Sequence, residues 1–182
     1  MALDNLDELK VQNASPFPTA LRYGVIGGLL SIAFGLATYL AGMQGTIPTI
    51  LNIVGTIVSI AVIVYAIRTH RDNDLGGYIS YGRCLGVGVL TSIIMGIIGA
   101  LWTVVLFNFI DPGITDMLMQ PQMEAMEEAG MSDDEIENAM SMAGKFMTAP
   151  FMAGMALVGS AFIGLIVSLI AGAVMKKDRT IA

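Results

Sequence analysis

Four long stretches of the chain, residues 23–42, 49–67, 84–110 and 150–175, contain no aspartate, glutamate, lysine, arginine or histidine. They are 20, 19, 27 and 26 residues long. About 20 apolar residues in a helix cross the hydrocarbon core of a bilayer. The two longer stretches are expected to tilt or to extend beyond the lipid. The sequence therefore predicts an all-α integral membrane protein with four transmembrane helices.

The composition agrees, because 55% of the 182 residues are hydrophobic and only 13% are charged. A soluble domain of this length would need more charges to cover its surface. We expect a single four-helix membrane domain over residues 20–178. Cytoplasmic tails at 1–19 and 179–182 are expected to flank it.

The N-terminal tail is acidic and has no apolar stretch, so we do not expect a cleavable signal peptide there. A short interfacial helix with Leu3, Leu6 and Leu9 on one face is one reading of the tail, and a disordered segment is the other. Pro16 and Pro18 are expected to end such a helix before the first span.

The basic residues predict the orientation of the chain, because lysine and arginine in short loops are retained on the cytoplasmic side. Eight of the nine basic residues fall on one side of the predicted spans, and Lys145 is the exception. Both termini are therefore predicted to be cytoplasmic. The loop at 111–149, with nine acidic residues and one lysine, is predicted to face outward with a net charge near −8.

Within this loop the pattern predicts an amphipathic helical hairpin between the third and fourth spans. Ser132 and Glu135 have the spacing of a capping box, which predicts a helix from Asp133 to about Phe146. A preceding helix is expected to hold Pro121 in its first turn and to end at Gly130. The acidic surface of the hairpin would carry Glu124, Glu127, Glu128, Asp133, Asp134 and Glu135.

The methionines of the hairpin have two readings. Met119, Met123 and Met126 recur at helical spacing, as do Ile136, Met140 and Ala143. Flexible methionine side chains commonly pack amphipathic helices onto a membrane or a partner. Clustered thioethers also bind Cu(I), which leaves a copper or silver sensor as an alternative. Because the spacing already satisfies packing, we favour packing and expect no metal and no cofactor.

Small residues recur every four positions in three of the spans. Such residues let helix backbones approach closely within a membrane, in one chain or between chains. We expect the following residues to serve helix packing: Gly24, Gly28, Gly88, Ser92, Gly96, Ala100, Ala156, Ser160, Gly164, Ser168 and Gly172.

Catalytic chemistry is not indicated. The spans hold no ionisable residue well inside the membrane, where such residues are costly and usually functional. His70, the only histidine, is expected to be a solvated loop residue near lipid headgroups, with Asp72 and Asp74 offsetting the nearby arginines. Cys84 is the only cysteine, which rules out an internal disulfide. We therefore expect no enzyme and no catalytic residue.

Several serine, threonine and asparagine residues do lie within the spans. Most of them can bond their own helix or a neighbouring one. For a solute pathway, Asn52 and Asn108 are the first candidates, with interhelical hydrogen bonding as their structural alternative.

Four further pieces of the chain resemble the bacterial domain of unknown function 4199 family. They are GGYISYGRCLGVG at the entry to the third span, FIDP at 109–112, EEAGMSDDEIENAM in the acidic loop and SLIAGAVMKK at the end. The likeness covers about residues 22–177, although Arg83 and Cys84 depart from the family pattern and receive no role. It implies a bacterial inner-membrane protein with four helices and two cytoplasmic ends, and it implies no activity, substrate or cofactor.

Two classes of function remain. The leading hypothesis is a non-enzymatic structural or accessory subunit that assembles laterally, as a homo-oligomer or within a larger membrane complex. The alternative is a small channel or transporter for a cation or a neutral solute, with the acidic loop concentrating cations at its mouth. The lipid bilayer is a partner in both cases, and no nucleic acid is expected.

Overall fold

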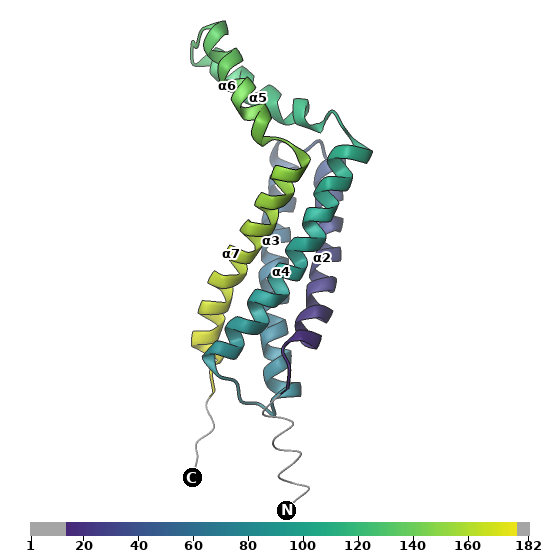
Figure 1. Cartoon of the computed structure of the whole chain (residues 1–182), viewed down its shortest axis with the longest axis vertical. Helices are drawn as coiled ribbons and strands as arrows, with labels where there is room; N and C mark the ends of the chain where they lie inside the picture. The colour runs from purple at the N-terminus through teal and green to yellow at the C-terminus, as the bar shows by residue number, and fades with distance from the viewer. Residues whose placement is uncertain (1–13, 178–182) are drawn as a thin grey trace, which may run out of the picture. The chain divides into compact units, whose positions relative to one another are not determined.

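The computed structural model describes residues 14–177, so the leucine-bearing N-terminal segment proposed above lies outside the described residues. Four helices in this range are long and apolar enough to cross a membrane. They are α2 (Phe17–Leu40), α3 (Thr46–Thr69), α4 (Tyr81–Val105) and α7 (Ala149–Met175), shown in Figure 1. The predicted all-α membrane fold is confirmed.

Two of the spans continue into short π-helical segments. α3 runs on into η1 (His70–Asp74), and α4 runs on into η2 (Leu106–Ile110). With η1, the helix of α3 extends to Asp74, beyond the apolar stretch at 49–67. With η2, the helix of α4 ends at Ile110, where the predicted stretch at 84–110 also ends. The described residues contain no β-strand, and a single isolated bridge pairs Ile79 with Lys177.

The chain divides into two compact units. One unit holds α2, α3 and η1, together with residues up to Ile98 of α4 and residues from Val158 of α7. The other unit runs from Gly99 to Leu157 and holds η2, α5 (Ile114–Glu128) and α6 (Asp133–Phe146).

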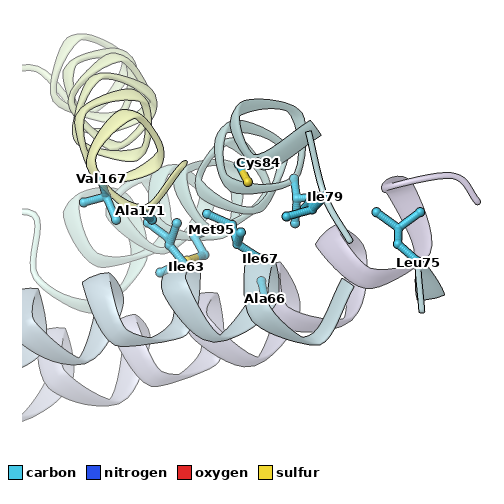
Figure 2. Packing of buried hydrophobic residues seen from close by; sticks show 10 residues of the cluster. Ile63, Ala66, Ile67, Leu75, Ile79, Cys84, Met95, Val167 and Ala171 are labelled. Carbon is cyan, nitrogen blue, oxygen red and sulfur yellow. The ribbon is translucent and has the colours of Figure 1, made fainter. Parts of the chain in front are cut away.

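The first unit has its apolar core near the connection between α3 and α4. Figure 2 shows this core, which gathers residues of α3, α4, α7 and the α3–α4 connection. Ile67, Cys84 and Val87 are fully buried within it. Most of the surface of the four spans nevertheless stays outside the protein interior, since only about a fifth of each apolar window is buried. Lipid or another protein must therefore cover the rest.

The second unit contains the hairpin of α5 and α6, which lie in contact with one another (Figure 1). The predicted limits of α6 and its capping box are confirmed, with Glu135 accepting hydrogen bonds from the Ser132 N–H at 2.9 Å and the Ser132 hydroxyl at 2.8 Å. Gly130, with φ of 76°, follows the end of α5 as predicted.

The placement of Pro121 in the first turn of its helix was wrong. α5 begins at Ile114, so Pro121 lies inside the helix. The start signal that the sequence reading overlooked is Asp111-Pro112-Gly113, where the Asp111 carboxylate accepts the Gly113 N–H at 3.0 Å. A helix that has already begun tolerates an internal proline at a cost of one backbone hydrogen bond and some bending.

Candidate functional site

The small residues of α2 lie where this helix meets α4. A Cβ atom added to Gly24 would come within 2.7 Å of the Ile94 side chain, and one added to Gly28 within 2.6 Å of Ile98. Real side chains do not approach so closely. The two glycines therefore allow α2 and α4 to be nearer than any larger residue would permit.

A second close approach joins α4 to α7. A Cβ added to Gly88 would overlap the Ser168 side chain, and one added to Gly164 would overlap Ser92. Gly88 of α4 therefore faces Ser168 of α7, and Gly164 of α7 faces Ser92 of α4. Each serine side chain occupies the space next to a glycine of the other helix. The serine hydroxyls donate within their own helices, Ser92 to the Val89 carbonyl and Ser168 to the Gly164 carbonyl.

The remaining small residues differ in their surroundings. Gly172 lies against Tyr81 and Cys84, since an added Cβ would be 3.1 Å from the Tyr81 ring. Gly96 is buried and Ser160 is half-buried. In the second unit Ala100 is half-buried, whereas Ala156 is exposed. The stripe predicted along α7 therefore does not have one uniform environment.

The polar residues of the spans mostly bond their own backbone. The hydroxyls of Thr56, Ser59, Thr91 and Thr103 each donate to the carbonyl four residues earlier, at 2.7 to 3.0 Å. These groups are thus satisfied locally. Asn52 differs, because its exposed side chain makes no hydrogen bond to any residue between 14 and 177.

Asn52 belongs to an exposed polar face on α3. Thr49, Asn52 and Thr56 are all exposed and recur at i, i+3 and i+7, which places them on one side of the helix. Thr56 also lines an apolar groove of about 700 Å³ between α3 and α7, together with Ile60, Val64, Ile163 and Ile170. We call Thr49, Asn52, Thr56 and this groove the α3 face.

A buried polar contact, which the sequence reading missed, lies at the end of α3. His70 was expected to be solvated, but its side chain is 0% exposed. Its Nδ1 lies 2.7 Å from Oδ2 of Asp74, and the same oxygen accepts the Thr19 hydroxyl at 2.5 Å. Because α3 continues helically through this segment, the two residues meet at i, i+4. The contact joins the start of α2 to the end of α3.

The two aspartates of this segment therefore have different partners. Asp72 pairs with Arg71 at 2.7 Å and with Arg68 at 3.5 Å, as the sequence suggested. Asp74 instead contacts His70 and Thr19, so its expected pairing with an arginine was wrong. His70 and Asp74 are four residues apart, so a helical assignment of this segment would have predicted their contact.

The acidic residues of the hairpin are spread over its surface. All six that the sequence singled out are exposed: Glu124, Glu127, Glu128, Asp133, Asp134 and Glu135. Hydrogen bonds that Ser132 donates to the Glu135 carboxylate hold the pKa of Glu135 below its usual value. The bond from the Ser132 backbone N–H has the larger effect, and the bond from its hydroxyl has the smaller effect. No group of three or more histidine, cysteine or carboxylate residues that could hold a metal occurs among residues 14–177.

Comparison with known proteins adds the family of the chain. The family model described as "Protein of unknown function (DUF4199)" matches residues 22–177, which is most of the sequence. No curated protein and no solved structure matches the chain.

Proposed function

Because this chain belongs to the DUF4199 family of proteins of unknown function, we propose its role from its own residues. It is a non-enzymatic structural or accessory subunit of a bacterial inner membrane, and it assembles laterally with itself or with another membrane protein. The observation that carries this proposal is the α3 face, which presents Asn52 on an apolar helix with no partner among residues 14–177.

The physical argument concerns the carboxamide of Asn52. Inside the hydrocarbon region an amide cannot bond to water, and an unsatisfied polar group there is costly. A carboxamide offers donors and an acceptor at once, so it can satisfy an identical group on a second copy of the chain. Interhelical bonds of this kind contribute about 0.6 to 2 kcal/mol in membranes. The adjoining apolar groove would supply the packing surface beside them.

The small-residue contacts direct the assembly to this face. Gly24, Gly28, Gly88 and Gly164 are occupied within the first unit, since each meets a side chain of a neighbouring helix. They are therefore not free to receive a second chain. The α3 face remains exposed and combines polar and apolar groups.

The proposed orientation places both termini in the cytoplasm. Its support is the distribution of lysine and arginine, of which Arg68, Arg71 and Arg83 lie around the connection of α3 to α4. In this orientation the α5–α6 hairpin faces outward. The side of the membrane on which the hairpin lies can be measured directly. Single cysteines are introduced into the hairpin of a Cys84→Ser variant and labelled with a reagent that does not cross the membrane.

The experiment that tests the assembly is the native mass of the complex released from its own membrane. A homo-oligomer or a stoichiometric second protein supports the proposal, and a monomer in both lipid and detergent contradicts it. Asn52→Leu is expected to weaken the association by about threefold to thirtyfold, which corresponds to the energy above. Asn108→Leu is the matched control, because Asn108 is also exposed but lies outside α3. Equal loss in both variants contradicts the assignment to α3.

The second candidate is a small channel or transporter. Its support is the exposed carboxylate surface of the hairpin, which would concentrate cations. It predicts flux in proteoliposomes that falls when Glu124, Glu127 and Glu128 are replaced by glutamine. Absence of flux across a panel of cations and small solutes would remove its support.

A further inference from the structure

The hairpin contains a groove that its own side chains do not fill. The groove has a volume of about 560 Å³ and is lined by Met119, Met123, Met140, Ile136 and Ser141, with the carboxylates Glu127, Asp133 and Glu137. We call it the methionine groove. Its thioethers come from both helices, since Met119 and Met123 belong to α5 and Met140 belongs to α6.

The register of the two helices brings these methionines together. Met119 reaches α6 at Gly144, because a Cβ added to Gly144 would lie 4.0 Å from the Met119 methyl carbon. The turn at 129–132 reverses the chain, so α5 and α6 run in opposite directions. A residue four positions after Met119 in α5 is therefore expected beside a residue four positions before Gly144 in α6. This places Met123 opposite Met140.

Gly144 has no side chain, which leaves space for the Met119 side chain to approach α6. Met140 and Gly144 are four residues apart and therefore lie on the same side of α6. The space above Gly144 is open to the end of Met119, which lies one turn from the Met123–Met140 pair. Three flexible thioethers can thus reach a common point in the groove.

Three thioethers that line one groove offer a soft donor set. Methionine sulfur selects Cu(I), whereas carboxylate oxygens suit hard cations. Glu127, Asp133 and Glu137 add negative charge around the groove and would attract a cation without replacing the sulfur ligands. The packing of α5 on α6 accounts for the methionine spacing, but it leaves the groove itself unfilled.

We propose that the methionine groove binds a soft monovalent metal ion, Cu(I), through the thioethers of Met119, Met123 and Met140. Ag(I) has the same charge and the same preference for sulfur, and it serves as a redox-inert probe. The site is independent of the α3 face and of the lateral assembly proposed above.

The test uses the full chain in lipid nanodiscs with methionine methyl groups labelled with ¹³C. Titration with Ag(I) is expected to shift the methyl signals of Met119, Met123 and Met140 together and to saturate at one ion per chain. The signal of Met142, which is 64% exposed and does not line the groove, is expected to stay unchanged. Absence of a shift, or equal shifts at all methionines, overturns the proposal.

The affinity for Cu(I) is measured by competition with a chromogenic Cu(I) chelator under anaerobic reducing conditions. Met119→Leu, Met123→Leu and Met140→Leu keep the size and apolar character of the side chain, so the hairpin is expected to fold. Each is expected to weaken binding by at least tenfold, and Met142→Leu is the matched control. Equal affinity in all four variants overturns the proposal.

X-ray absorption at the copper edge gives the ligand type without any substitution. Scattering from three sulfur neighbours is the expected result. A first shell of oxygen or nitrogen atoms alone would place the ion on the carboxylates and overturn the thioether assignment. Circular dichroism of each variant confirms that a loss of binding is not a loss of the helices.

Discussion

Asp74 and Thr19 are 55 positions apart in the sequence and share a hydrogen bond of 2.5 Å. The Asp74 oxygen that accepts this bond also lies 2.7 Å from Nδ1 of the buried His70. One carboxylate oxygen therefore connects the first turn of α2 to the π-helical end of α3. Because buried polar groups are costly when they lose their partners, this contact stabilises the pairing of the first two spans.

The first prediction concerns this carboxylate. Asp74→Ala is expected to lower the free energy of unfolding by about 1 to 3 kcal/mol, because it leaves His70 buried with neither ring nitrogen bonded by a described residue. Thermal unfolding in detergent measures the loss. Asp72→Ala in the same segment is the control, and it is expected to have the smaller effect because its ion pairs with Arg68 and Arg71 are solvent-exposed. The reverse order would contradict the assignment.

Features that depend on neighbouring positions in the sequence were predictable, whereas contacts between distant segments were not. The four spans were predictable because an apolar run of sufficient length has few other stable solutions. The α6 helix was predictable because Ser132 and Glu135 act on each other within one turn. The Thr19–Asp74 contact depends on which helices are neighbours, and periodicity along one helix carries no information about that.

The alignment of one helix against another was also not predictable from the sequence. The spacing of Gly88, Ser92, Gly164 and Ser168 suggested close helix contact, but it did not say which residue would face which. In the structure each glycine faces a serine on the other helix. The interhelical register of α5 and α6 was equally hidden, since the sequence gives each methionine face but not the alignment of one face with the other.

The second prediction tests the contact of α4 with α7. Gly164→Ala is expected to lower stability by about 1 to 3 kcal/mol, because the added methyl group would overlap the Ser92 side chain. Gly159→Ala on the same helix meets no described atom within 4 Å and is expected to be neutral or to stabilise by up to about 1 kcal/mol. Thermal unfolding compares the two. Addition of Ser92→Gly to Gly164→Ala should recover part of the loss, and no recovery would point to a different clash.

The third prediction concerns pH. The pKa of Glu135 is lower in the folded hairpin than in an unfolded chain, because Ser132 donates to its charged form. Its contribution to the stability of α6 is therefore complete above the ordinary glutamate pKa of about 4.3 and is lost as the pH falls through the lowered value. The protection of the amides at the start of α6, measured as their hydrogen-exchange rate relative to the intrinsic rate at each pH, should fall over this range. Glu135→Gln is expected to remove this component, and Glu137→Gln is expected to keep it.

The last prediction concerns the proline inside α5. Pro121 has no N–H to donate to the Met117 carbonyl, and a proline in a helix interior costs about 3 kcal/mol relative to alanine. Pro121→Ala is expected to stabilise α5 by up to this amount and to slow amide exchange in the residues around position 121. Gln122→Ala, one position further on, is the control and should change exchange little. If the bending that an interior proline imposes positions Met119 and Met123 toward α6, the Pro121→Ala helix should also bind Ag(I) more weakly. Slower exchange with unchanged Ag(I) binding would show that the helix itself, and not its bend, positions the thioethers.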